Sequence, residues 1–215
     1  MVKVKMCGIT NFDDYKCAAD AGADFVGFIF HEKSPRYIEP DCAREIISKF
    51  RANRLQKIGV FVNEKSERVK EIYNKLQLDF VQLHGDESPD YCTDLKLPYW
   101  KVIRVRDSSD ISLLFYYPTP VFLLDTYIKD RYGGTGKSFD LKFAEVAIKT
   151  GVQIVIAGGL SDENINAAIG LNPFAVDINS GVEKYPGKKD CQKIRKIMEI
   201  IRNRRDVDVR KENAK

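Results

Sequence analysis

Short apolar runs alternate with amphipathic segments along almost the whole chain, and this alternation constrains the fold more than any other feature. The apolar runs are rich in Val, Ile and Phe, as buried parallel strands are. They cover residues 2–7, 24–30, 57–62, 80–85, 99–105, 121–126, 152–159 and 175–181. Alternation of strands with helices is typical of a parallel sheet. Eight such units within 215 residues predict a single (β/α)8 TIM barrel of the short kind.

Helix-like segments fill the intervals between these runs. They cover residues 12–22, 41–52, 66–76, 140–151, 161–170 and 190–204. Ser161 is expected to cap one of these helices, which ends at Gly170. The segments 88–96 and 108–117 have a weaker helical pattern. They are expected to be helical because the alternation of strands and helices calls for a helix at each of these places. A doubly wound sheet is the structural competitor, but eight even units without a dinucleotide fingerprint favour the barrel.

Charge is uneven along the chain. The formal net charge is +4, yet residues 202–215 hold six Lys/Arg and three Asp/Glu, which accounts for +3 of it. The rest is nearly neutral, so no basic face for nucleic acid is expected. We predict a barrel domain over residues 1–203 and a charged, frayed tail over residues 204–215.

The N-terminus enters a strand pattern without a signal-peptide region, and no run is apolar enough to span a membrane. The five cysteines are odd in number and scattered, without a C-x-x-C pair. A disulfide framework or a zinc site is therefore not expected, and a reducing cytoplasm is the predicted location. With two histidines in the chain, a multi-histidine metal site is nearly excluded.

In a barrel of this kind, functional groups lie at the carboxyl ends of the strands. Cys7 ends the first strand, and side-chain alternation places Lys3, Lys5 and Cys7 on one face, which is expected to point into the barrel. Such a thiol is either a base or nucleophile, or an inert buried cysteine. The lysine two residues away would favour the thiolate.

Asp125 stands near the end of the sixth strand, where a carboxylate is either a helix cap or a catalytic group. The loop behind it is long and glycine-rich. Its GGTGKS stretch fails as a phosphate loop because Walker A needs glycine where Arg131 stands. We interpret these glycines as hinges of a closing lid.

The turns after the seventh and eighth strands suit a phosphate group. Gly158 and Gly159 permit close backbone approach before the segment that begins at Ser161, and Ser180 and Gly181 follow the next strand. Exposed amides at such turns bind phosphate, and these two loops often form the phosphate site of a barrel.

Other polar residues at the strand ends are open to two interpretations. Gln82 and His84 share a face of the fourth strand and either bind substrate or are structural. Arg36 lies in SPRYI and is either solvated or a fork for a carboxylate. Asp177 alternates with Asn179 in the eighth strand and is expected to face inward.

In order and spacing, a set of short motifs resembles the phosphoribosylanthranilate isomerases of tryptophan biosynthesis. The resemblance covers about residues 1–200 and rests on VKMCGIT, DFVGFIFHEKSPRYI, GVFVN, VQLHGDE, LLDT with GGTGKSFD, AGGLSDENI and DINSGVEKYPGKKD. KMCGIT and the pair SGVE and PGKKD are the most diagnostic. The charged tail departs from the family pattern.

This resemblance implies an Amadori rearrangement of N-(5′-phosphoribosyl)anthranilate without metal or cofactor. It implies Cys7 as base and Asp125 as acid, and Arg36 as the partner of the anthranilate carboxylate. It places the phosphate on the amides around Gly158, Gly159, Ser180 and Gly181, with Asp177 as a further anthranilate contact. The expected partner is a phosphorylated small molecule, and the expected assembly is a monomer or a homodimer.

Two alternatives remain open at this point. The related isomerase of histidine biosynthesis uses aspartate where Cys7 stands. A non-catalytic phosphosugar-binding barrel would keep the loops after the seventh and eighth strands but lose the acid–base pair.

Overall fold

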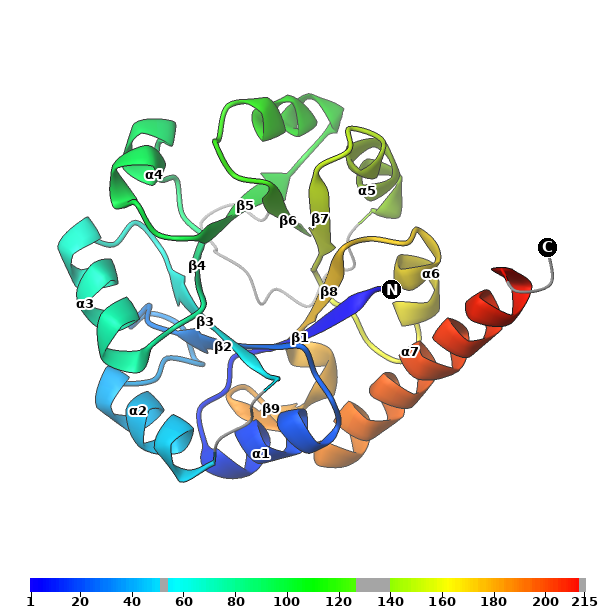
Figure 1. Cartoon of the computed structure of the whole chain (residues 1–215), viewed down its shortest axis with the longest axis horizontal. Coiled ribbons are helices and arrows are strands. Elements are labelled where there is room, and N and C mark those ends of the chain that lie inside the picture. The colour runs from blue at the N-terminus through cyan, green and yellow to red at the C-terminus, as the bar shows by residue number, and fades with distance from the viewer. Residues whose placement is uncertain (51–53, 127–139, 213–215) are drawn as a thin grey trace.

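The computed structural model describes residues 1–50, 54–126 and 140–212, without the side chains of 205–212. Eight parallel strands close into one barrel in chain order, from β1 to β8 and back to β1 (Figure 1). Their bounds are β1 Lys3–Cys7, β2 Phe25–Ile29, β3 Gln56–Phe61, β4 Phe80–Leu83, β5 Tyr99–Val105, β6 Val121–Thr126, β7 Gln153–Ile156 and β8 Ala175–Ile178. The predicted (β/α)8 TIM barrel is confirmed.

Helices surround the barrel as an outer ring (Figure 1). They are α1 Phe12–Asp20, α2 Pro40–Lys49, α3 Ser66–Leu76, α4 Pro89–Leu95, α5 Leu141–Ile148, α6 Ile165–Gly170 and α7 Cys191–Glu212, with the 3₁₀ helices η1 Ser108–Phe115 and η2 Ser180–Val182. Caps explain several of the starts: the Asn11 side chain accepts from the Asp14 amide at α1, and Ser88 accepts from Tyr91 at α4.

Strand alternation divides the apolar side chains between two cores. Val4 and Met6 point outward into the layer between strands and helices, whereas Phe25, Ile58 and Trp100 fill the barrel interior. Cys7 lies in a separate small cluster with Ile29 and Val60. The inward direction predicted for the first strand's polar face is therefore correct.

Three local predictions differ from the structure. Segment 108–117 forms the 3₁₀ helix η1, capped by Asp107 and Asp110, in place of an α-helix. The helix expected from Ser161 begins at Ile165, after Asn164, because the Asn164 side chain bonds backward to Ser161 and Gly159. A hairpin of β9 Glu183–Tyr185 and β10 Lys188–Lys189 precedes α7 and was not expected.

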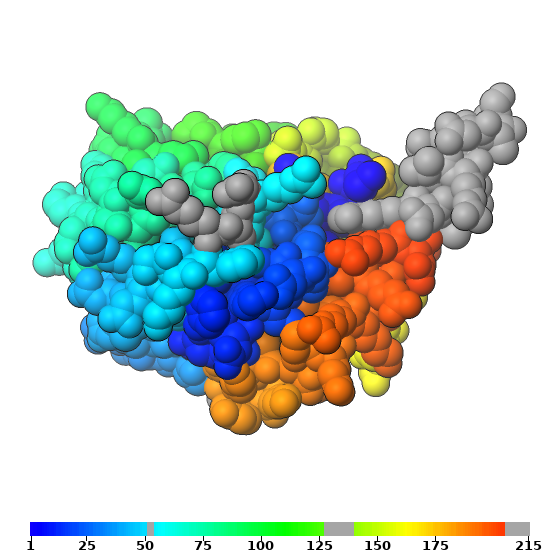
Figure 2. Space-filling model, turned by 60° about the horizontal axis from the view of Figure 1, so that its bottom comes forward, coloured from blue at the N-terminus to red at the C-terminus, as the bar shows by residue number. Residues whose placement is uncertain are grey.

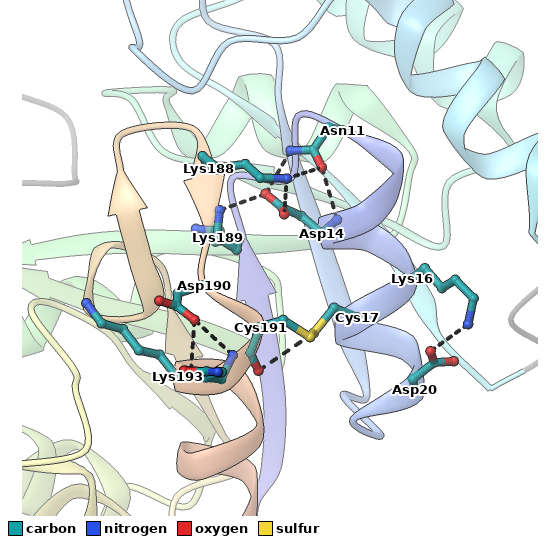
Figure 3. Close-up of a disulfide and its surroundings, with 11 residues drawn as sticks. Asn11, Asp14, Lys16, Cys17, Asp20, Lys188, Lys189, Asp190, Cys191 and Lys193 are labelled. Carbon is teal, nitrogen blue, oxygen red and sulfur yellow. Dashed lines mark hydrogen bonds and ion pairs between the residues drawn. A yellow bond between two sulfur atoms is a disulfide. The ribbon is translucent and has the colours of Figure 1, made fainter.

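A disulfide joins Cys17 of α1 to Cys191 at the start of α7, with their Cα atoms 6.0 Å apart (Figure 3). Figure 2 shows α1 (blue) beside the beginning of α7 (orange) on the outside of the barrel. The expectation of no disulfide is wrong because closure of the barrel brings together two cysteines that are 174 residues apart in the sequence. The cysteine argument for a reducing compartment fails with it, so the cytoplasmic location stays a prediction.

Two further expectations concern the edges of the described chain. The loop interpreted as a lid falls in residues 127–139, outside the described residues. Helix α7 continues to Glu212, and the domain boundary at residue 203 with its frayed tail stays a prediction. Among the described residues, no helix is long and apolar enough to cross a membrane.

Candidate active site

Cys7 ends β1 and lies inside the barrel directly beside Gly27 of β2, its register partner. A Cβ atom on Gly27 would lie 2.8 Å from the Cys7 Sγ and 3.2 Å from the Lys5 Nζ. Glycine at this position therefore leaves the space that the thiol and the ammonium group occupy. Both side chains are buried, with Cys7 4% and Lys5 0% exposed.

A buried cluster of charges surrounds the thiol. The Lys5 Nζ donates to the Asp177 Oδ2 at 2.8 Å. The Lys189 Nζ donates to the Asn179 Oδ1 at 2.7 Å and to the Glu183 Oε1 at 3.0 Å. With Arg36, this makes three cations against two carboxylates, so one positive charge is in excess near Cys7.

The pKa of the Cys7 thiol is nevertheless raised from its ordinary value. Burial is the main cause, and Asp177 adds to it, while the positive charges of Lys5 and Lys189 oppose the rise. Burial disfavours the charged form of Lys5 and lowers its pKa. Asp177 and Cys7 outweigh burial, so the pKa of Lys5 is raised. Lys5 thus favours the thiolate, as predicted, but the loss of hydration on burial outweighs the effect of the lysines and favours the thiol.

Arg36 is buried, contrary to its expected place on a solvated or open rim. Its Nε and Nη2 donate to the two Glu183 oxygens at 2.8 and 2.7 Å. Its side chain packs over Gly8, where a Cβ atom would lie 2.9 Å from the Arg36 Cδ. The Arg36 guanidinium therefore binds the buried Glu183 carboxylate through two nitrogens. Its third nitrogen, Nη1, has no acceptor among the described residues.

Asp125 points into the barrel one residue before the end of β6. Its Oδ1 accepts from the Thr126 amide at 2.8 Å. Its Oδ2 lies 3.4 Å from the His84 Nε2, and the Gln82 Nε2 lies 2.9 Å from the His84 Nδ1. Gln82, His84 and Asp125 therefore form a line from the end of β4 to the end of β6.

The predicted phosphate residues are brought together by β7 and β8. A Cβ atom on Gly181 would lie 1.9 Å from the Leu160 carbonyl oxygen, so only glycine lets the two turns touch. Gly158 and Gly159 have φ of +89° and +63°, a backbone that favours glycine. The Ser161 amide already donates to the Asn164 Oδ1, so the glycine amides and Ser180 are the candidate donors for a phosphate group.

The structure gathers the predicted residues into three groups. One is the pair of turns after β7 and β8, the second is the charged cluster that contains Cys7, Arg36 and Asp177, and the third consists of Gln82, His84 and Asp125. Strands β1 and β6 stand on different sides of the closed barrel (Figure 1). A ligand across the mouth would therefore meet a thiol from one side and a carboxyl group from the other, an arrangement able to move protons at two atoms of one molecule.

Sequence reasoning missed Lys189, Glu183 and Asn179. Lys189 is held from two sides: its amide donates to Asp14 of α1, and its ammonium group binds the strand 8 turn. Figure 3 shows Lys188 and Lys189 reaching Asn11 and Asp14 beside the disulfide. The two lysines of PGKKD were the available signal, although no spacing rule assigns them a target.

Comparisons with known proteins agree with this geometry. Residues 4–200 match the family model for N-(5′-phosphoribosyl)anthranilate (PRA) isomerase. The N-(5′-phosphoribosyl)anthranilate isomerase of Trichlorobacter lovleyi is 44% identical over 207 residues, which are 96% of this chain and 99% of that relative.

Solved structures give the same result. A structure of monomers derived from the dimeric enzyme of Thermotoga maritima has a TM-score of 0.82 at 39% identity and covers 93% of this chain and 97% of that one. A phosphoribosylanthranilate isomerase in complex with reduced 1-(o-carboxyphenylamino)-1-deoxyribulose 5-phosphate has a TM-score of 0.80 at 37% identity, with 93% and 97% covered. The chain belongs to the N-(5′-phosphoribosyl)anthranilate isomerase family.

Proposed function

We propose that the chain converts N-(5′-phosphoribosyl)anthranilate to 1-(o-carboxyphenylamino)-1-deoxyribulose 5-phosphate in tryptophan biosynthesis. The observation that carries this proposal is the placement of Cys7 and Asp125 at the carboxyl ends of β1 and β6, on different sides of the barrel mouth. The reaction needs a base and an acid that reach one sugar from two sides.

Asp125 is the acid. Its carboxyl group gives a proton to the furanose ring oxygen, the bond from that oxygen to C1′ breaks, and the anilino nitrogen becomes an iminium. The carboxylate left behind accepts from the Thr126 amide, a hydrogen bond that strengthens as negative charge forms on the oxygen. General acid catalysis of this kind contributes about 10²–10⁴-fold.

Cys7 is the base. Its thiolate removes the C2′ proton, and the electrons of the C–H bond flow to the iminium and give an enolamine. Tautomerisation to the ketone releases the proton of the C2′ hydroxyl and takes one up at C1′, so acid and base return to their starting forms. Lys5 and Lys189 stabilise the thiolate because their charges favour it over the thiol.

Other residues hold the substrate. The phosphate binds at the touching turns of Gly158, Gly159, Ser180 and Gly181, with the amides as donors. The anthranilate carboxylate binds the Nη1 of Arg36, which Glu183 holds in place. Asp177 accepts from the anilino nitrogen through its Oδ1, which is buried and lacks a hydrogen-bond partner among the described residues.

Turnover of phosphoribosylanthranilate, generated in situ and followed by loss of its fluorescence, tests the proposal. We expect rapid conversion by the wild type and a loss of about 10²-fold or more in Cys7→Ala and Asp125→Asn. Cys42→Ser is the matched control, because Cys42 is an exposed free thiol on α2. Wild-type protein that binds the substrate without converting it would leave only a phosphosugar-binding barrel.

We infer that the chain works as a monomer or a homodimer on this phosphorylated substrate. The relative from Thermotoga maritima is described as dimeric, with monomers derived from it, which supports both forms within one family. Light scattering coupled to gel filtration distinguishes them by mass.

A further inference from the structure

The sequence left Gln82 and His84 open to a substrate-binding or a structural role, and their side chains are turned toward each other and toward Asp125. Gln82 is 1% exposed, and the His84 side chain is 11% exposed. The Gln82 amide nitrogen lies 2.9 Å from the His84 Nδ1. Gln82 and His84 therefore contact other protein groups, and a substrate could bind these two side chains only by displacing those contacts.

The hydrogen bond from Gln82 selects one form of the His84 ring. With the Gln82 amide nitrogen facing it, Nδ1 accepts and carries no proton, and the Gln82 Oε1 is left without a hydrogen-bond partner among the described residues. A neutral imidazole with an unprotonated Nδ1 carries its proton on Nε2. The His84 Nε2 faces the Asp125 Oδ2 at 3.4 Å, longer than a formed hydrogen bond, and such catalytic contacts tighten when substrate is bound.

Within the described part of the chain, no hydrogen-bond acceptor other than Asp125 is assigned to this N–H. The His84 Nε2 is buried and has no hydrogen-bond partner of normal geometry among the residues that the structure describes. The charged side chains that follow His84 in the chain are occupied: Asp86 pairs with Arg104, and Glu87 pairs with Lys101. The Asp125 carboxyl group is thus the acceptor within reach.

The protonation state of His84 matters for an acid at Asp125. An imidazolium at this distance would form an ion pair that favours the carboxylate and would deprive Asp125 of the proton that it must deliver. A neutral ring still donates one hydrogen bond. That bond directs Oδ2, while Oδ1 accepts from the Thr126 amide.

We propose that Gln82 and His84 are positioning residues for Asp125: Gln82 holds His84 as the neutral Nε2–H form, and this N–H orients the Asp125 carboxyl group for proton delivery. The proton leaves the Asp125 carboxyl group for the ring oxygen of the sugar, and the His84 Nε2–H and the Thr126 amide stabilise the carboxylate that remains. This inference rests on the proposed function of Asp125 as the acid.

The first test observes the ring directly. The chain contains two histidines, so ¹⁵N-histidine labelling gives two sets of ring signals, and a His84→Gln sample assigns them. We expect His84 at neutral pH to have a protonated Nε2 and an unprotonated Nδ1. A His84 that is protonated on Nδ1, alone or as imidazolium, would overturn the proposal.

The second test separates positioning from substrate binding by kinetics. His84→Leu removes the donor and is expected to lower kcat about 10-fold or more, the scale of one lost hydrogen bond to a charged group. His84→Gln places an amide donor at the position of Nε2 and is expected to restore most of kcat. Unchanged kcat in His84→Leu, equal losses in both variants, or a rise in KM alone would contradict the positioning role.

Gln82→Glu provides a variant of almost unchanged shape. Its carboxylate would accept from Nδ1–H and stabilise the imidazolium, so we expect kcat to fall about 10-fold or more with KM nearly unchanged and the ¹⁵N signals of a doubly protonated ring. Binding of reduced 1-(o-carboxyphenylamino)-1-deoxyribulose 5-phosphate verifies that the site is folded. Wild-type kcat in Gln82→Glu would sink the inference even if His84→Leu failed to fold.

The proposed function and this inference fail in different ways. Absence of wild-type turnover, or normal turnover in Asp125→Asn, removes the function or the acid itself. Normal wild-type turnover, an inactive Asp125→Asn and a fully active His84→Leu remove only the positioning role.

Discussion

The Lys5 ammonium group donates to the Asp177 carboxylate at 2.8 Å inside the barrel, beside the Cys7 thiol. Lys5 lies on β1 and Asp177 on β8, and they are register partners where the last strand closes on the first. Removal of one partner from a buried ion pair leaves an uncompensated charge, which costs about 3–5 kcal/mol. The pair therefore couples closure of the barrel to the electrostatics of the candidate base.

The raised pKa of Cys7 predicts how its thiolate titrates. Burial favours the thiol, so the ultraviolet absorbance of the thiolate is expected to appear with a midpoint above the ordinary value of about 8.5. Subtraction of the Cys7→Ala titration in a Cys42→Ser background isolates the step, because burial raises the pKa of Cys92 to about 11. A midpoint below the ordinary value would mean that Lys5 and Lys189 outweigh burial.

Asp177→Asn is expected to move the same midpoint in the opposite direction. The negative charge of Asp177 is one of the causes that raise the pKa of Cys7, and its removal favours the thiolate. The Asp177→Asn midpoint should therefore fall below that of the wild type in the same absorbance titration. An unchanged or higher midpoint contradicts the assignment of this charge.

Arg36→Lys is expected to weaken substrate binding. A lysine ammonium cannot bind Glu183 through two nitrogens and offer a third to a ligand, as the Arg36 guanidinium can. We expect KM to rise about 10-fold or more, the scale of a charge-assisted hydrogen bond, in steady-state kinetics. Arg68→Lys is the control, since Arg68 is a half-exposed partner of Glu71 on α3. Equal KM in both variants would remove Arg36 from the carboxylate site.

Gly181→Ala is expected to separate the turns after β7 and β8. The added methyl group would overlap the Leu160 carbonyl oxygen, and overpacking of this kind costs about 1–3 kcal/mol. Denaturant unfolding should show the loss of stability, and inorganic phosphate should bind more weakly. Gly170→Ala is the control, because a Cβ atom there meets its nearest neighbour at 3.4 Å. Equal phosphate affinity in the two variants would move the phosphate site elsewhere.

The disulfide predicts a stability that depends on redox conditions. The bond between Cys17 and Cys191 closes a loop with a sequence separation of 174, for which chain entropy gives up to about 5 kcal/mol. Cys17→Ser or treatment with a reductant should lower the melting temperature of the wild type, whereas Cys42→Ser should not. Identical melting temperatures with and without reductant would show that the two thiols are not bonded in solution.

The amino-acid sequence by itself determined the class of fold and the location of the chemistry. Apolar runs of period two and amphipathic segments of period 3.6 are local properties, so they specify eight strands and their helices without knowledge of distant contacts. The places of Cys7 and Asp125 at strand ends follow from the same pattern. The weak segment 108–117 is where local periodicity failed, and there Asp107 and Asp110 stabilise a 3₁₀ helix.

Only the tertiary structure decided which side chains meet. Arg36 and Glu183 are 147 residues apart in the sequence, and Cys17 and Cys191 are 174 apart. No local propensity encodes such pairs, because closure of β8 on β1 is what brings the last quarter of the chain against the first. The direction of the Cys7 pKa shift has the same origin: Lys5 lowers the pKa, as its place in the sequence predicts, but burial by the whole barrel outweighs the lysine.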